Sequence, residues 1–369
     1  MRTCTFDSFD SADGYDDIID VRSPAEFAED HIPGAINLPV LNNEERVIVG
    51  TLHRQAGEFE ARKTGAGLIS ANIARHLSAY FDDKPKSYRA LVYCWRGGQR
   101  SKSLATVLGA VGWQATLIAG GYKTYRAFVR NALEEICTRL SPIVLTGLTG
   151  SGKTLILRRM QELGAPQILD LEGLANHRGS LLGDEVRVDN AQQPTQKGFE
   201  SRLLHALAKL DLERPVFIES ESKRIGTLNC PEPLWQKMIN SPVALANVSL
   251  QERARYLVDD YQHFISSPEQ LIGKLPVLKK MHGAGQIEEW IEMTKAQAWL
   301  QLSESLLAVH YDPSYRRCSN FNKATFEVEV LRLEQPCIDQ TIEELARFEA
   351  SVTAELSAGP PSQGVVVGD

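Results

Sequence analysis

The chain has 369 residues, of which 43% are hydrophobic and 24% are charged, and its formal net charge at pH 7 is −7. This composition is ordinary for a globular protein, the length predicts two domains or at most three, and the acidic balance excludes a uniformly basic nucleic-acid coat while allowing a local basic surface. No apolar run approaches the roughly 20 residues that span a bilayer, and the first residues lack the layout of a secretory signal, so we expect no membrane association and a cytoplasmic location.

Short apolar segments alternate with helical patterns in the first part of the chain. Strands are predicted at residues 18–22, 35–38, 90–93 and 114–118. Helices are predicted at residues 24–30, over most of 42–81, and at 101–111 and 122–140. Strands that alternate with helices in this way predict a parallel sheet with both faces covered.

A second α/β unit is expected to begin after Ser141 and Pro142. A strand at 143–146, a helix at 154–163, strands at 167–171 and 216–218 and a helix-rich region at 250–309 are predicted in it. We therefore predict an α/β protein with one domain at 1–130, a second at 138–350 and a disordered tail at 357–369, where Gly, Pro and Ser are frequent.

The six cysteines show neither the paired spacing of a metal site nor a disulfide framework. We expect reduced structural or surface thiols at Cys4, Cys137, Cys230, Cys318 and Cys337. No metal site is expected from protein ligands alone.

The first chemical motif is the segment CWRGGQR at residues 94–100. Cys94 follows a strand and precedes a helix, so its thiolate would face backbone N–H groups and the positive end of that helix. Gly97 and Gly98 permit the tight turn that points these groups inward, while Arg96 and Arg100 add positive charge. The segment predicts a nucleophilic cysteine in an anion-binding loop.

Stretches around this loop resemble the signature of rhodanese domains. They are DVRSPAEF at 20–27, HIPGAINLP at 31–39, VYC at 92–94 and AGGY at 119–122. The resemblance implies a rhodanese-like parallel-sheet domain and a sulfur or selenium carrier in which Cys94 forms a persulfide or selenosulfide. The loop is one residue longer than in the usual sulfurtransferases. It has the length found in phosphatases of the same fold, although Tyr93 stands where those enzymes often have His.

The second motif, GLTGSGKT at residues 147–154, is a complete Walker A pattern between an apolar strand and a helix. The backbone of such a loop holds a diphosphate, Lys153 would neutralise the outer phosphate and Thr154 would bind Mg²⁺. The predicted diphosphate-binding residues are Gly147, Gly150, Ser151, Gly152, Lys153 and Thr154. No complete adenine-reading motif is apparent, so the diphosphate need not belong to ATP.

Carboxylates follow two strands of this second unit. Glu219 and Glu221 end the strand that begins at residue 216, and we slightly favour Glu219 as the residue that holds the water shell of Mg²⁺. Asp170 and Glu172 close the strand at 168–171, which in many P-loop enzymes ends near the active site. The alternative to a Mg²⁺ role is that these carboxylates are simply exposed to solvent at the strand ends.

A rhodanese domain followed by a P-loop domain resembles the bacterial tRNA 2-selenouridine synthases. The resemblance covers roughly residues 18–320, and its most specific stretches lie at 45–51, 94–101, 120–126 and 169–180. It implies that geranyl diphosphate alkylates the sulfur of 2-thiouridine at the wobble position of tRNA, and that selenophosphate then replaces the S-geranyl group by selenium. A selenophosphate-producing enzyme is an implied partner.

This resemblance suggests a role for each loop. The P-loop, with Lys153, Thr154 and Mg²⁺, would hold the diphosphate of geranyl diphosphate. Cys94 and its loop would bind selenophosphate or carry the selenium derived from it.

An anionic tRNA requires a cationic surface, and its single-stranded bases stack on aromatic rings. The basic candidates are Arg253, Arg255, Lys274, Lys279, Lys280, Arg316 and Arg317, and the aromatic candidates are Trp95, Tyr122 and Tyr125. Each basic cluster also fits a plain solvated face.

Two other classes of function stay open. One is a phosphatase of rhodanese fold that uses Cys94 and Arg100. The other is a regulator without enzymatic activity that binds nucleotide and senses sulfur.

Overall fold

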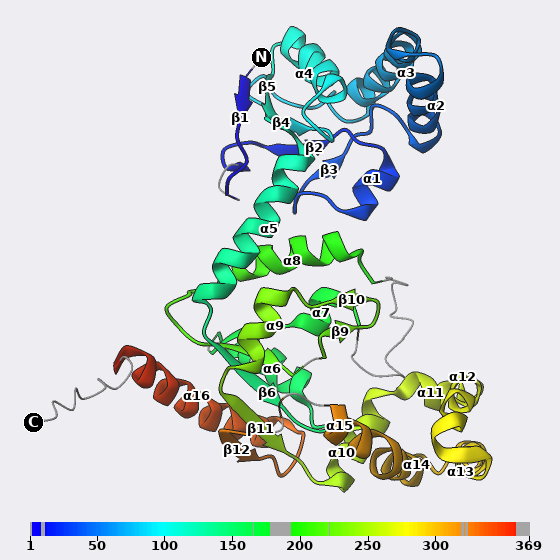
Figure 1. Ribbon diagram of the computed structural model, residues 1–369, viewed down its shortest axis with the longest axis vertical. Coiled ribbons are helices and arrows are strands. Elements are labelled where there is room, and N and C mark those ends of the chain that lie inside the picture. The colour runs from blue at the N-terminus through cyan, green and yellow to red at the C-terminus, as the bar shows by residue number, and fades with distance from the viewer. Residues whose placement is uncertain are drawn as a thin grey trace, which may run out of the picture. The chain divides into compact units, whose positions relative to one another are not determined.

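The computed structural model describes residues 2–8, 12–164, 166–177, 193–220, 222–318, 321 and 324–358. The chain divides into two compact units (Figure 1). The first contains Met1–Ile136 and Gln192–Lys209, and the second contains Cys137–Ala191 and Leu210–Asp369. The domain bounds 1–130 and 138–350 stay predictions, since the segment at 192–209 groups with the first unit.

The first unit is built on a five-stranded parallel sheet. Its strands lie in the order β1 (Arg2–Cys4), β5 (Gln114–Ile118), β4 (Arg89–Tyr93), β2 (Asp17–Asp20) and β3 (Ile36–Asn37). Strand β4 is central, and its residues from Ala90 to Tyr93 are buried because helices cover both faces of the sheet. The position of β4 brings the residue that follows it, Cys94, to the middle of the carboxyl edge.

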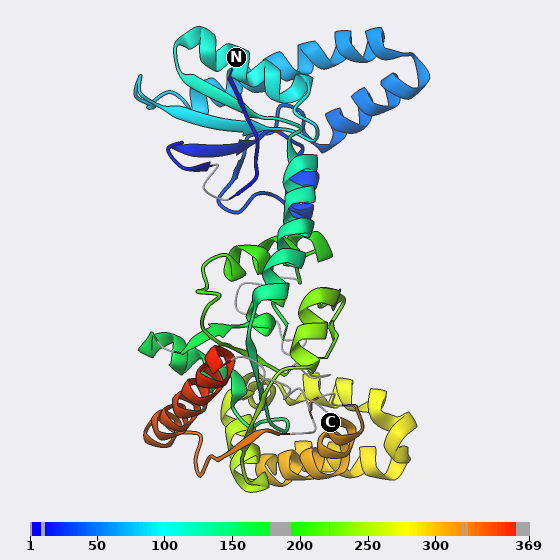
Figure 2. The same ribbon diagram turned by 60° about the vertical axis from the view of Figure 1, so that its left-hand side comes forward.

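Helices of the first unit follow the predicted pattern, apart from a helix at 196–207 that was not predicted. They are α1 (Pro24–Glu29), α2 (Asn43–Gln55), α3 (Glu58–Ala79), α4 (Gln99–Val111), the start of α5 (Tyr122–Arg139) and α8 (Gln196–Leu207). The helical region expected at 42–81 is two helices that run back along each other (Figure 2), because the chain turns at Gly57 with φ 95°.

The second unit contains another five-stranded parallel sheet. Its strands lie in the order β12 (Phe326–Glu329), β11 (Val243–Asn247), β6 (Pro142–Thr146), β8 (Val216–Glu219) and β7 (Gln167–Leu169). A short antiparallel hairpin joins β9 (Arg224–Ile225) and β10 (Leu228–Asn229). Strand β6 is central and fully buried, as β4 is in the first unit. The predicted α/β class with two parallel sheets is confirmed.

Helices of the second unit fall into two groups. Those near the sheet are α6 (Lys153–Leu163), α7 (Leu171–Ala175), α9 (Glu232–Ile239), α10 (Leu250–Asp260) and α16 (Gln335–Ala358). The others are α11 (Gln262–Ser266), α12 (Pro268–Lys274), the 3₁₀ helix η2 (Leu275–Leu278), α13 (Lys279–Lys295), α14 (Trp299–Leu306), the π-helical turn η3 (Leu307–Tyr311) and α15 (Asp312–Cys318).

The second group of helices has its own apolar core. Phe264, Leu271, Ile287, Trp290 and Leu302 are buried together there, apart from the core that covers the sheet. The helix-rich character expected for 250–309 is therefore confirmed. This helical layer packs against the P-loop through α10.

Two sequence expectations need correction, and the second also extends beyond the described residues. The strand expected at 167–171 ends at Leu169, because Asp170 caps helix α7 and accepts a hydrogen bond from the Gly173 N–H at 2.6 Å. Helix α16 extends to Ala358, so residues 357 and 358 of the expected tail are helical, and residues 359–369 lie outside the described part. Among the described residues, none of the helices has the length and apolar character that crossing a membrane requires.

Candidate functional site

The cysteine loop begins at the carboxyl end of β4 and leads into α4. Cys94 is buried, and its Sγ atom accepts a hydrogen bond from the Gly98 N–H at 3.2 Å. The Ser101 hydroxyl lies 3.2 Å from the same sulfur and 3.2 Å from the Gly98 carbonyl oxygen. The Gly98 N–H and the Ser101 hydroxyl thus lie beside the sulfur at the first turn of a helix, and the nucleophilic role of Cys94 stays a prediction.

Glycines are required where this loop meets the start of α5. Gly97 has φ 64°, and a Cβ atom there would lie 2.9 Å from the Ile118 carbonyl oxygen. Gly121 has φ 59°, and its Cβ would lie 2.2 Å from the Cys94 carbonyl oxygen. That oxygen accepts a hydrogen bond from the Tyr122 N–H at 2.8 Å. The loop is therefore held in its curl by backbone contacts that larger residues would prevent.

The two arginines of the loop differ in their surroundings. Arg96 is exposed, whereas Arg100 donates to both carboxylate oxygens of Glu26, at 2.7 and 3.2 Å. Burial raises the pKa of Glu26, but the hydrogen bonds and charge of Arg100 outweigh it and hold that pKa below its usual value. The charge that Arg100 was expected to bring to the loop is thus balanced by a carboxylate.

Two residues of this loop's surroundings were not predicted as site residues. Ser101 stands in the motif that follows Cys94, but only the fold brings its hydroxyl to the sulfur. Glu26 comes from helix α1 and its partner Arg100 is 74 residues away in the sequence. The position of Ser101 in the first turn of α4 could have been inferred from the sequence, and this would have suggested that its hydroxyl lies near the loop. No sequence signal identifies Glu26.

The aromatic candidates for base stacking need correction. Tyr122 and Tyr125 are buried, with exposed fractions of 2% and 0%. The Tyr122 hydroxyl donates to Asp30 at 2.8 Å and its ring lies 4.0 Å from the buried guanidinium of Arg22. Both tyrosines are core residues, while Trp95 is half-buried against the Tyr122 ring.

Other cysteines differ from Cys94 in their surroundings. Burial raises the pKa of Cys137 to about 11 and that of Cys230 to about 12. Thiols of this kind stay protonated near neutral pH and do not act as nucleophiles.

The P-loop begins at the carboxyl end of β6 and leads into α6. Gly150 and Gly152 have φ values of 80° and 71°, which the tight curl of the loop requires. The Lys153 ammonium donates to the Gly147 carbonyl oxygen at 2.9 Å, so its charge lies over the loop. Ser151 is buried inside it.

Hydroxyl and carboxylate oxygens gather at the start of α6. The Thr154 hydroxyl donates to Glu172 Oε2 at 3.1 Å, and the Glu172 N–H donates to Glu219 Oε1 at 2.7 Å. Glu219 pairs in register with Leu145 of the P-loop strand. Hard oxygen donors of this kind fit Mg²⁺. Glu172, which was noted only as an acid after a strand, joins Glu219 here.

Another predicted acid, Asp170, does not join this group. The Asp170 carboxylate caps helix α7 and so has a structural role. Glu221 lies outside the described residues.

Two side chains, Arg253 on α10 and Tyr315 on α15, brace the P-loop and its strand. The Arg253 guanidinium donates to the Thr149 carbonyl oxygen at 3.0 Å and to both oxygens of Asp312, at 2.9 and 2.8 Å. The Tyr315 hydroxyl lies 2.8 Å from the Thr146 hydroxyl and 2.9 Å from that of Ser220. Arg253 was expected to contact nucleic acid, but only 3% of it is exposed, so that expectation is wrong.

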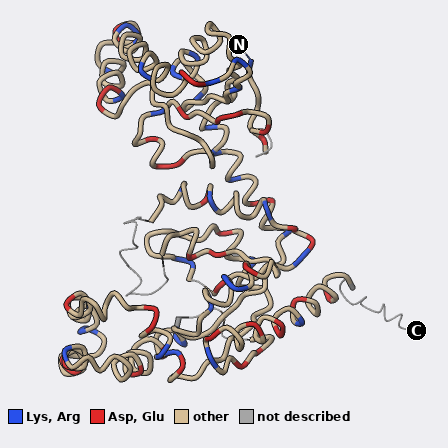
Figure 3. The backbone as a smooth tube through the Cα atoms, turned by 180° about the vertical axis from the view of Figure 1, so that it is seen from behind, with Lys and Arg blue, Asp and Glu red and all other residues tan. Residues whose placement is uncertain are grey.

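The remaining basic candidates lie on the surface or partly on it. Arg255, Lys279, Lys280, Arg316 and Arg317 are exposed, and the Lys274 ammonium lies 5.5 Å from the centre of the Phe264 ring. Figure 3 shows Lys and Arg interspersed with Asp and Glu along the described chain. Their role in binding nucleic acid stays a prediction.

Comparison with known proteins agrees with the two-unit architecture. Residues 9–128 match the family described as "Rhodanese-like domain", and residues 140–273 match the family described as "tRNA 2-selenouridine synthase AAA domain". A rhodanese-related protein from Thermoplasma volcanium of known structure is 17% identical over 36% of this chain and 93% of its own, with a TM-score of 0.23.

Curated relatives match most of the chain. The tRNA 2-selenouridine synthase of Nitrosomonas europaea is 36% identical over 248 residues, which are 66% of this chain and 63% of that protein. The chain thus spans less than two thirds of that relative's length. The tRNA 2-selenouridine synthase of Pseudomonas syringae pv. syringae is 31% identical over 331 residues, which are 81% of this chain and 87% of that protein. With both units matched, the chain belongs to the tRNA 2-selenouridine synthase family.

Proposed function

We propose that this protein is an enzyme that replaces the sulfur of 2-thiouridine in tRNA by selenium, through an S-geranyl intermediate. The name of its relatives gives the overall modification. The observation that carries the proposal is the donor-lined sulfur of Cys94 in a chain that also has a complete P-loop. Selenium transfer needs an anion site with a nucleophile, and alkylation by a prenyl diphosphate needs a diphosphate site.

In the first step, the thiocarbonyl sulfur of the uridine attacks C1 of geranyl diphosphate. A carbon–sulfur bond forms, the carbon–oxygen bond breaks and its electron pair leaves with the diphosphate, while the uracil loses its N3 proton. The P-loop N–H groups and Lys153 stabilise the charge that develops on the leaving diphosphate. Thr154, Glu172 and Glu219 would hold Mg²⁺, which neutralises a diphosphate when bound.

In the second step, selenium from selenophosphate forms a bond to C2 of the alkylated uracil. The carbon–sulfur bond at C2 breaks and geranylthiol leaves with a proton. Water attacks the phosphorus of selenophosphate, so that a phosphorus–oxygen bond forms, the phosphorus–selenium bond breaks and phosphate is released. The exchange changes no oxidation state. Cys94, Gly98 and Ser101 form the site that receives selenophosphate, because backbone N–H groups at a helix start bind tetrahedral oxyanions.

A reaction with purified components tests this proposal. The protein is incubated with tRNA that contains 2-thiouridine, with Mg²⁺, geranyl diphosphate and selenophosphate, and the digested nucleosides are analysed by mass spectrometry. We expect 2-selenouridine only when both small substrates are present and S-geranyl-2-thiouridine when selenophosphate is omitted. Formation of 2-selenouridine without geranyl diphosphate contradicts the S-geranyl route. Hydrolysis of an aryl phosphate without any change in the tRNA points to a phosphatase instead.

A further inference from the structure

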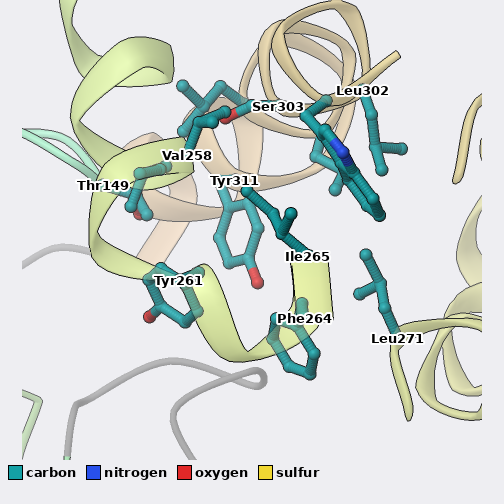
Figure 4. Close-up of a pocket in the computed structure, with 13 residues that line it drawn as sticks. Thr149, Val258, Tyr261, Phe264, Ile265, Leu271, Leu302, Ser303 and Tyr311 are labelled. Carbon is teal, nitrogen blue, oxygen red and sulfur yellow. The ribbon is translucent and has the colours of Figure 1, made fainter. Parts of the chain in front are cut away.

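We propose that an apolar pocket beside the P-loop binds the hydrocarbon chain of a short prenyl diphosphate. The pocket holds about 610 Å³ of empty space, part of which is open solvent at its mouth. It lies within the second unit (Figure 4). Its lining residues are Thr149, Leu257, Val258, Tyr261, Phe264, Ile265, Leu271, Trp299, Leu302, Ser303, Leu306, Leu307 and Tyr311. The inference rests on the proposed function, since it supplies the second half of the same substrate's site.

The pocket starts at the P-loop itself. Thr149 of the loop forms part of the lining, and in Figure 4 it lies on one side of the pocket while Leu271 and Leu302 lie on the other. A ligand whose diphosphate occupies the P-loop can therefore extend its other end past Thr149 into the helical layer. The diphosphate and the chain would be joined near Thr149.

Helix α10 fixes the pocket relative to the loop. A Cβ atom on Gly150 would lie 3.0 Å from Leu257 Cγ and 3.1 Å from the Arg253 carbonyl oxygen, so α10 packs directly on the P-loop. Leu257 lines the pocket, and Arg253 ties the Thr149 carbonyl to Asp312, next to the lining residue Tyr311. Because α10 contacts the P-loop and also lines the pocket, one ligand can occupy both sites at the same time.

The lining chemistry favours a hydrocarbon over a nucleobase. Aliphatic and aromatic side chains supply most of it, and its polar groups are the hydroxyls of Thr149, Tyr261, Ser303 and Tyr311 and the indole N–H of Trp299. A purine has several ring donors and acceptors whose burial without partners is costly, whereas each methylene group of an apolar chain gains about 0.8 kcal/mol when it leaves water. The pocket and the P-loop together match a molecule with a diphosphate at one end and an unsaturated hydrocarbon at the other.

Ser303 offers a direct test. It is half-buried on α14 and faces the pocket, while Gln301 is exposed on the same helix. We would measure Kd for geranyl diphosphate and for inorganic pyrophosphate by calorimetry, with Mg²⁺, on the full chain and on the variants Ser303→Leu and Gln301→Leu. We expect geranyl diphosphate to bind the unmodified chain at least about tenfold more tightly than pyrophosphate. Ser303→Leu should remove that difference without changing the pyrophosphate Kd, and Gln301→Leu should change neither.

The outcomes separate this inference from the proposed function. If pyrophosphate and geranyl diphosphate both fail to bind, the diphosphate role of the P-loop is wrong. If both bind with equal Kd, or if Ser303→Leu and Gln301→Leu act alike, the pocket is not the chain site although the P-loop role survives. If ATP binds more tightly than geranyl diphosphate and Ser303→Leu weakens ATP, the pocket receives a nucleotide and the inference is overturned.

Ile265 gives a second test that does not depend on filling the pocket. It is half-buried on α11 and lines the pocket, and Gln262 is exposed on the same helix. Ile265→Ala enlarges the pocket, so the ratio of alkylation rates with farnesyl and geranyl diphosphate should rise about tenfold. Gln262→Ala should leave the ratio unchanged. An unchanged ratio in Ile265→Ala, with the protein folded by circular dichroism, overturns the assignment.

Discussion

The cysteine loop and the P-loop occupy equivalent positions in two separate sheets. Each follows the central strand of a five-stranded parallel sheet and leads into a helix, and each depends on glycines at positive φ. They differ in where the chemistry lies. In the first, the buried Cys94 sulfur accepts a hydrogen bond from the Gly98 N–H, and Glu26 pairs with Arg100. In the second, the Lys153 ammonium and the hydrogen-bonded pair of Thr154 and Glu172 lie at the loop that is proposed to bind a diphosphate.

The comparison teaches that an anion cradle can serve two different purposes. Under the proposed function, one cradle would surround the protein's own sulfur atom, and the other would stabilise charge on a leaving group. The proposed half-reactions should therefore be separable by mutation, with each loop affecting one step and leaving the other intact.

Removal of the sulfur is expected to have the largest effect. Cys94→Ala should lower the rate of selenium transfer by about a thousandfold or more, because the proposed selenophosphate site loses the sulfur at its centre, and should leave geranylation unchanged. Mass spectrometry of nucleosides in single-turnover reactions measures both rates. Cys337→Ala, which removes a half-buried thiol on α16, is the matched control. A parallel loss of geranylation in Cys94→Ala argues that the two loops share one step.

Lys153→Ala tests the P-loop. Geranylation should fall by about a hundredfold or more, because the leaving diphosphate loses a charged donor. Selenium transfer to tRNA that already carries S-geranyl-2-thiouridine should proceed at the normal rate. Arg158→Ala removes an exposed cation from the same helix α6 and should have little effect. Loss of selenium transfer from the pre-geranylated tRNA contradicts the division of labour.

Ser101→Ala sharpens the account of the cysteine loop. The hydroxyl lies 3.2 Å from Cys94 Sγ, and a hydrogen bond to a charged group contributes about 1.5–3 kcal/mol, so selenium transfer should slow by about tenfold or somewhat more. The control is Ser103→Ala, which removes a half-buried serine hydroxyl on the same helix that donates to the Gln99 carbonyl oxygen at 2.9 Å. Equal rates in the two variants show that Ser101 is merely a structural residue.

Glu26→Gln has the smallest expected effect and tests the balance of charge around the cysteine loop. The pKa of Glu26 is lowered in the folded state from an ordinary value of 4.5. The stabilisation is therefore fully present above about pH 4.5 and is lost as the pH falls through the lowered folded pKa. We expect the variant to have a free energy of unfolding about 1 kcal/mol lower at pH 7 and a smaller difference near pH 3.

Urea unfolding at several pH values, followed by tryptophan fluorescence, measures the Glu26 effect. Arg62 and Glu58 form an exposed pair on α3, so Glu58→Gln serves as the control and should change stability less. A difference between wild type and Glu26→Gln that grows as the pH falls contradicts the sign of the lowered pKa.

Much of the fold follows from local sequence pattern. The alternation of apolar strands with helices predicted both parallel sheets, and the loops at residues 94–100 and 147–154 lie where strand–loop–helix patterns place them. Strand β7 is shorter than expected because Asp170 caps a helix, which apolar periodicity does not register. Strands β11 and β12 were not predicted. Strand β12 is a short edge strand, whereas β11 lies between β12 and β6 and is a short apolar run, which periodicity does not distinguish from a buried helical segment.

Sequence by itself determined the identity of the two loops, because each requires a fixed order of residues within a few positions. Only the tertiary structure decided which residues surround them. Glu26 pairs with Arg100, and Arg253 is buried and donates to the Thr149 carbonyl oxygen. Tyr122 and Tyr125 lie in the core. From the local sequence, Arg253 and the two tyrosines were expected to contact nucleic acid at the surface. The physical reason is that burial and pairing depend on residues far apart in the chain, which meet only when the sheets and helices pack.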